Sequence, residues 1–262
     1  MPTLVTDQGI VHYETYGRGR PVILLHGWLG SWALWRNTIE ELGKDYKTYA
    51  LDFFGFGDSV RSQQVSVDLY IDLVYQFMEK LGIVKAPLIG HSMGGTVALG
   101  VAARYPSKVV KTIIIGSPIV GSSLNPILKL SGYQRIANLV YTFPFLKDSA
   151  IYVLTRFGGR EGAATYRMVA EDAGKVAPQP FFQSIGTLRN TNLVEKLPLL
   201  QIPILGIYGK RDIIVDPRQG KLLLQYAPSA QQAWFEGSGH FPMMDERERF
   251  HGVVREFLEK RS

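Results

Sequence analysis

The sequence predicts an α/β fold: a mostly parallel, twisted sheet with helices on both faces and a helical segment inserted between two strands. Three observations predict this fold. Short, wholly apolar runs alternate with segments of helical periodicity along most of the chain. Two of these runs stop at a tight glycine turn, at Gly27 and at Gly90. The alternation breaks after Pro118 and resumes at Pro203. Because a wholly apolar strand has both faces covered, the pattern favours a parallel sheet between helix layers.

The amino-terminal part predicts a hairpin followed by regular strand and helix alternation. Alternating segments at 3–6 and 10–16 flank Asp7-Gln8-Gly9, which is typical of an opening hairpin. Right-handed crossovers then make the following strands parallel. Strands are expected at 21–25, 46–51, 86–90 and 109–115, and helices at 34–43, 67–82 and 93–105.

The middle of the chain differs in character. Residues 119–195 have helical periodicity and many aromatic side chains, but no convincing strand pattern. We expect them to form a helical cap, or lid, over the carboxyl edge of the sheet, where open α/β folds bind ligands. Residues 1–118 and 196–262 then form the core domain. After the insertion, strands are expected at 203–208 and 231–235, and helices at 217–227 and 246–260.

Composition excludes several classes of protein. The 262 residues carry a formal net charge of +6, but the basic residues are scattered and no nucleic-acid-reading motif accompanies them, so we expect no nucleic-acid partner. The absence of cysteine excludes disulfides, thiolate nucleophiles and cysteine-ligated metals. No signal-peptide pattern or run of about 18 apolar residues occurs, which predicts a cytoplasmic protein without an integral membrane segment. The oligomeric state stays open.

One short stretch points to chemistry. Gly90-His91-Ser92-Met93-Gly94 places a serine between glycines, where an apolar strand ends and a helix is expected to begin. This is the Gly-x-Ser-x-Gly nucleophile elbow, whose sharp turn holds the serine hydroxyl above the sheet. Larger side chains at the glycines would collide with neighbouring backbone. The alternative is a serine that merely caps the following helix.

A serine nucleophile requires a base and a carboxylate elsewhere in the chain. Of the five histidines, His240 lies in a glycine-flanked loop after the last expected strand, at the same sheet edge as Ser92. Asp212 closely follows the preceding strand, whereas Asp216 stands before a proline and has the pattern of a helix N-cap. The chain order Ser92, Asp212, His240 is a known order for a triad.

Attack on a carbonyl also requires two backbone donors for the oxyanion. The amide of Met93, directly after the serine, is one candidate, and the amide of Trp28, in the loop after the third strand, is the other. Gly27, Leu29 and Phe241 adjoin these positions in the sequence. We therefore expect them to bind the substrate.

Together these motifs resemble those of the α/β-hydrolases over essentially the full chain. The matching motifs are His26-Gly27, Asp52-x-x-Gly55-x-Gly57-x-Ser59, the elbow at Ser92, Gly209-x-x-Asp212 and Gly239-His240. The resemblance implies an eight-stranded sheet, a triad of Ser92, Asp212 and His240, and no cofactor. It does not name a substrate.

Three other polar residues are expected to be structural. His91 should point away from the pocket if Ser92 points into it. His26 should stabilise its own loop, and Asp52 should hold a turn. No metal-ligand cluster is apparent in the sequence, so no metal is expected.

A serine esterase acting on a small-molecule ester with a small to medium apolar acyl group is the predicted function. Ser92 argues against the aspartate-nucleophile members of the family. Carbon-carbon bond hydrolysis of ring-cleavage products and perhydrolase or haloperoxidase-like chemistry use the same triad. A ligand receptor of the same fold that does not turn over its ligand is a more distant alternative.

Overall fold

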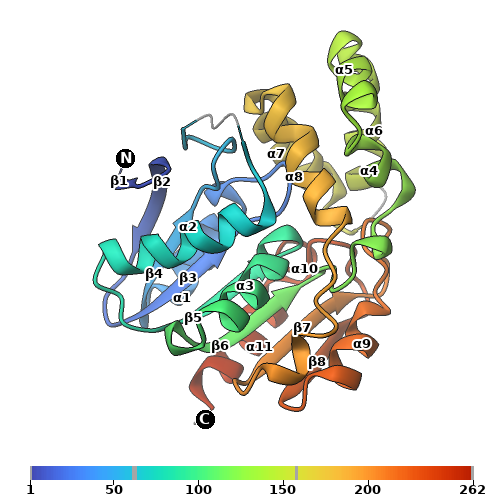
Figure 1. The fold of residues 1–262 in the computed structure, drawn as a ribbon. Helices are drawn as coiled ribbons and strands as arrows, with labels where there is room; N and C mark the ends of the chain where they lie inside the picture. The colour runs from blue at the N-terminus through green and yellow to red at the C-terminus, as the bar shows by residue number, and fades with distance from the viewer. Residues whose placement is uncertain (1, 61–63, 157–158, 261–262) are drawn as a thin grey trace.

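A computed structural model describes residues 2–60, 64–156 and 159–260 and shows a central sheet with helices on both faces (Figure 1). The sheet has eight strands in the order β1-β2-β4-β3-β5-β6-β7-β8. β1 pairs with β2 and β2 with β4 in antiparallel fashion, and the other neighbours are parallel. The strands are β1 (Thr3–Thr6), β2 (Gly9–Tyr16), β3 (Arg20–Leu25), β4 (Tyr46–Leu51), β5 (Ala86–His91), β6 (Val109–Ile115), β7 (Ile204–Gly209) and β8 (Ala230–Phe235).

Helices cover both faces of this sheet, and the central strands are therefore buried on both sides. The first face packs against α2 (Val67–Lys80), α3 (Met93–Arg104) and α9 (Gln219–Tyr226). The second packs against α1 (Arg36–Leu42) and α11 (Arg247–Glu259). The predicted α/β architecture with a mostly parallel sheet is therefore confirmed.

Five α-helices of the described residues lie between β6 and β7, at the upper right of Figure 1, together with two short 3₁₀ turns. They are α4 (Pro126–Ser131), α5 (Gln134–Thr142), α6 (Pro144–Arg156), α7 (Gly162–Lys175) and α8 (Pro178–Arg189). Their contacts are largely with one another, as in the pairs α6 and α7 or α4 and α8. All five fall within residues 119–195, which we call the cap. Its division from the core as a separate domain stays a prediction.

Element boundaries agree with the sequence pattern except where side chains alter a helix start. The helix expected from 34 opens with a 3₁₀ turn, Trp32–Trp35, before α1. The helix expected from 217 begins at Gln219, because the Asp216 carboxylate accepts the Arg218 amide (2.9 Å) and forms a turn first. A separate short helix, α10 (Pro242–Asp245), precedes α11. None of the described helices is long and apolar enough to cross a bilayer.

Candidate active site

The turn between β5 and α3 is strained. Ser92 has φ 51° and ψ −117°, a backbone conformation that costs a non-glycine residue about 1–3 kcal/mol. Its amide is fixed by the Ile115 carbonyl at 2.8 Å. A Cβ atom at Gly90 would lie 2.3 Å from the Gly94 carbonyl oxygen, and one at Gly94 would lie 2.2 Å from that of Leu25. The glycines are therefore required by backbone crowding, as the sequence predicted.

The Ser92 side chain does not serve the helix that follows it. Ser92 occupies the N-cap position of α3, but its side chain makes no capping hydrogen bond. It is only 6% exposed and borders a partly open cavity. The capping alternative raised by the sequence is therefore wrong.

A histidine at the wall of the same cavity is hydrogen-bonded to an aspartate. The Asp212 Oδ2 atom accepts a hydrogen bond from His240 Nδ1 at 2.7 Å. Its Oδ1 atom accepts the amides of Ile214 and Val215 at 2.8 and 2.9 Å, which fixes the carboxylate. Because Nδ1 carries the proton in this contact, Nε2 of the neutral ring is free to act as an acceptor. His240 and Ser92 both border the cavity.

A glycine leaves room for this pair. Gly116, directly after β6, has φ 54°, and a Cβ atom there would lie 3.0 Å from His240 Nδ1 and 3.2 Å from Asp212 Oδ2. Its structural contribution is the space in which Asp212 and His240 approach each other.

Asp216 is engaged elsewhere. Its carboxylate binds the Arg218 guanidinium at 2.6 Å and the Arg218 amide at 2.9 Å. Hydrogen bonding to Arg218 holds the pKa of Asp216 below its ordinary value. The structure therefore brings Asp212, and not Asp216, to His240.

Two acidic residues that the sequence reasoning missed hold the His240 loop. Asp245 accepts the Gly239 amide at 2.9 Å. Glu246 accepts the Gly237 amide at 3.0 Å and the Ser238 hydroxyl at 2.7 Å. Their position just after the histidine, in "GHFPMMDE", was the available signal.

His91 lies differently from the expectation. His91 borders the Ser92 cavity and its ring centroid lies 4.6 Å from that of His240, so the ring does not point away from the site, whereas the structural role expected of it agrees with its contacts. Its Nε2 donates to the His240 carbonyl at 2.9 Å, which is a supporting contact. Burial, reinforced by His240, lowers the pKa of His91 well below its ordinary value. The ring therefore stays neutral and packs beneath the histidine loop.

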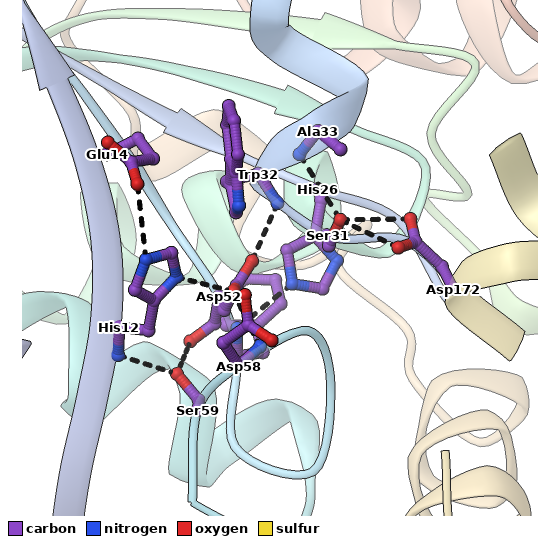
Figure 2. A network of polar contacts seen from close by, with 11 residues as sticks. His12, Glu14, His26, Ser31, Trp32, Ala33, Asp52, Asp58, Ser59 and Asp172 are labelled. Atoms are coloured by element: carbon purple, nitrogen blue, oxygen red, sulfur yellow. Dashed lines mark hydrogen bonds and ion pairs between the residues drawn. The ribbon is translucent and has the colours of Figure 1, made fainter. Parts of the chain in front are cut away.

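The loop between β3 and α1, residues 26–35, is held by hydrogen bonds to the segment that directly follows β4. The Phe53 amide donates to His26 Nε2 at 2.9 Å, so the proton lies on Nδ1, which donates to the Gly27 carbonyl at 2.7 Å. The Trp32 amide donates to Asp52 at 2.6 Å, a contact drawn in Figure 2. These contacts are the loop and turn roles expected of His26 and Asp52.

Three side chains in the described ranges place potential metal ligands within 4.8 Å of one another: His12, Asp52 and Asp58. Figure 2 shows them packed together beside the β3–α1 loop. Asp52 already accepts from His12 Nδ1 at 2.8 Å and from the amides of Asp58 and Trp32 at 2.9 and 2.6 Å. The hydrogen bond to Asp52 also raises the pKa of His12. With its carboxylate engaged in this way, the group acts as a turn-closing network.

The cavity beside Ser92 is partly open to solvent and has mostly apolar walls. The expected substrate-binding residues Gly27, Leu29 and Phe241 all line it, and Trp28 joins them. None of its described lining residues is a lysine or an arginine. The remaining walls are Gly30, Leu34, His91, Leu128, Ile151, Leu154, Thr155, Met168, Val169 and Ile214.

Comparison with known proteins agrees with this fold. A family model described as "alpha/beta hydrolase fold" matches residues 20–152, about half of the chain. The chain therefore belongs to the α/β-hydrolase fold family.

Individual relatives indicate which kind of hydrolase this chain resembles. The chain is 28% identical over 256 residues to a pimeloyl-[acyl-carrier protein] methyl ester esterase of Vibrio campbellii, covering 94% of this chain and 98% of that protein. An enol-lactonase from Burkholderia xenovorans superposes with a TM-score of 0.88 at 19% identity, covering 99% and 100% of the two chains. A thermophilic esterase from Thermogutta terrifontis does so with a TM-score of 0.86 at 23% identity, covering 98% and 97%. The protein is an esterase-like hydrolase.

Proposed function

We propose that this protein is a serine esterase in which Ser92 is the nucleophile, His240 the general base and Asp212 the residue that orients the histidine. One observation carries the proposal. A buried serine in a strained turn and a histidine bonded to a fixed carboxylate border one cavity. Strain of this kind persists only where surrounding structure enforces it, and it is concentrated at functional sites.

The reaction follows from these positions. His240 Nε2 accepts the Ser92 proton as Oγ attacks the acyl carbon, and the tetrahedral adduct collapses when the same proton passes to the departing alcohol. Water then attacks the acyl-enzyme, His240 again takes and returns a proton, and the carboxylic acid leaves. Asp212 stabilises the imidazolium in both halves, because its Oδ2 lies 2.7 Å from His240 Nδ1.

The amides of Trp28 and Met93 serve as the oxyanion donors in this proposal. Met93 is the first residue of α3, and the amides in the first turn of a helix have no partner within the helix. Trp28 borders the cavity from the opposite loop. Each such donor contributes about 10²–10³-fold to turnover in enzymes of this kind.

The walls favour an apolar acyl group of small to medium size. The cavity beside Ser92 adjoins a second, mostly apolar cavity among the cap helices, which Lys147 also lines, and the two share the walls Trp28, Leu29, Leu128, Ile151 and Leu154. The cap, as a lid over the core, then supplies selectivity while the chemistry stays in the core. The esterase relative from Vibrio, named for a methyl ester, supports cleavage of a carboxylic ester.

The cavity beside Ser92 argues against hydrolysis of ring-cleavage products, since a dienoate carries a carboxylate and no lysine or arginine is among the described residues that line this cavity; Lys147 lines only the second one. A hydrolysis screen tests the choice. Nitrophenyl esters from two to sixteen carbons should be cleaved with steady turnover, and a ring-cleavage dienoate should not. Activity on the dienoate alone would replace the esterase proposal, as would oxidation of a halide with peroxide in the absence of ester cleavage. Binding without turnover would identify a receptor.

Ser92→Ala tests the nucleophile. Turnover should fall about 10⁴–10⁶-fold, because loss of one triad member leaves only binding and oxyanion stabilisation. A fluorophosphonate should label the native protein once, at Ser92, and should not label the variant. Labelling at another serine would contradict the assignment.

A further inference from the structure

The β3–α1 loop contains a second strained residue, and it directly follows the proposed oxyanion donor. Leu29 has φ 56° and is only 4% exposed. A leucine adopts a positive φ at an energetic cost, so neighbouring contacts must hold it there. One contact is local: the Gly30 amide donates to the Gly27 carbonyl at 3.2 Å and closes the turn around Leu29.

Two further contacts come from the cap, one on each side of Leu29. The Trp28 indole Nε1 donates to the Phe181 carbonyl of α8 at 3.0 Å. The Ser31 hydroxyl lies 2.9 Å from both carboxylate oxygens of Asp172 on α7. Figure 2 shows Asp172 reaching from its helix to Ser31. The strained turn is thus held between two helices of the cap.

Asp172 is an unusual residue to find at such a contact. Its side chain is buried, at 4% exposure, and burial raises the pKa of its carboxyl to about 6. The charged groups that act on it are Lys175 and Glu171 on its own helix and Asp52 from the core. A buried carboxyl destabilises a fold when ionised, so its position there needs a compensating role.

We propose that Asp172 is a positioning residue for the oxyanion hole: through Ser31 it fixes the turn at Leu29 and thereby the direction of the Trp28 amide. The inference rests on the proposed esterase function. It makes the cap part of the apparatus that aligns the catalytic loop. The donor itself is in the core, but its orientation depends on a side chain that is 141 positions away from Ser31 in the sequence.

Substitution of Asp172 distinguishes a role in positioning the Trp28 amide from a role in packing the cap. In Asp172→Ala the turn loses one of its two cap anchors, and kcat should fall at least tenfold, up to the roughly 10²-fold that loss of an oxyanion donor costs. KM should stay within about threefold, because the oxyanion forms only after binding. Asp172→Asn keeps an acceptor for Ser31 and should restore most of kcat. Glu171→Gln, on the same helix but exposed, is the matched control and should leave kcat unchanged.

Ser31→Ala approaches the same contact from the core and serves if Asp172→Ala fails to fold. The double variant completes a thermodynamic cycle. If Asp172 acts through Ser31, adding Asp172→Ala to Ser31→Ala should lower kcat by less than about threefold further. Full additivity, an unchanged kcat in Asp172→Ala, or a loss confined to KM would overturn the proposal. In each of these cases the esterase proposal is tested separately: it holds if a fluorophosphonate labels Ser92 stoichiometrically in the native protein.

Discussion

The buried carboxyl of Asp172 should make the stability of the protein fall as the pH rises. Burial raises its pKa from the ordinary 3.8 to about 6 in the folded chain. Between pH 3.8 and pH 6 the carboxyl of Asp172 has released its proton in the unfolded chain and still holds it in the folded chain. The folded state therefore binds more protons, and its stability declines with increasing pH until the folded carboxyl ionises near pH 6.

The size of the effect follows from the two pKa values. Each pKa unit corresponds to about 1.4 kcal/mol, so ionised Asp172 lowers the free energy of unfolding by about 3 kcal/mol above pH 6. Asparagine resembles the protonated carboxyl in size and hydrogen bonding but does not titrate. Asp172→Asn should therefore be more stable than the native protein by up to about 3 kcal/mol at pH 8 and no more stable at pH 4.

Urea unfolding followed by tryptophan fluorescence at pH 4, 5, 6, 7 and 8 measures this difference. Other titrating groups are common to both proteins and cancel in the comparison. Glu171→Gln, whose carboxylate is exposed and contributes least to the raised pKa of Asp172, should show a much smaller pH-dependent gain. A stability difference that is constant across this range, or an asparagine variant that is less stable at pH 8, would refute the reasoning.

The other predictions concern the site itself. Asp212→Asn should lower turnover by about 10⁴-fold, on the scale of the same change in a serine protease, while Asp216→Asn should keep most activity on a nitrophenyl ester; the reverse order would displace the acid to Asp216. His240→Gln should abolish the rise of rate with pH along with the activity, because only neutral imidazole accepts the serine proton; a preserved rise would require another base. Gly116→Ala should reduce kcat with circular dichroism unchanged, since its Cβ would lie 3.0 Å from His240 Nδ1 and the residue has φ 54°; normal activity would show that this pair tolerates displacement. Replacing residues 119–195 by a short linker should change ester selectivity and lower kcat without abolishing it, as measured with short soluble esters; complete inactivity in a folded protein would place a catalytic group in the cap.

Much of the core could be predicted because its signals are local. The strands at 46–51 and 109–115 coincide with β4 and β6, since mainly apolar runs rich in β-branched and aromatic residues between polar or glycine turns mark where a buried strand begins and ends. The elbow at Ser92 was recognisable for the same reason. Its glycines and serine lie within five positions, and backbone crowding fixes each of them.

Contacts between distant segments could not be predicted. Nothing in α7 distinguishes Asp172 from the exposed Glu171 beside it until the fold brings Ser31 to one of them. The direction of the His91 side chain could not be predicted either, because side-chain direction next to a strained turn depends on ψ as well as on position in the chain. Helix starts were misplaced where a side chain such as Asp216 forms a turn first.

The two hydrogen bonds that join the cap to the β3–α1 loop also bear on protein engineering. Caps of related hydrolases are attractive parts to exchange when a new specificity is wanted. In this protein a transplanted cap would have to bring an acceptor for the Ser31 hydroxyl and a backbone carbonyl for the Trp28 indole, at the places now held by Asp172 and Phe181. A chimera whose new cap matched only the apolar walls would acquire the pocket of the other enzyme. By the role proposed for Asp172, it would lose the orientation of the Trp28 amide.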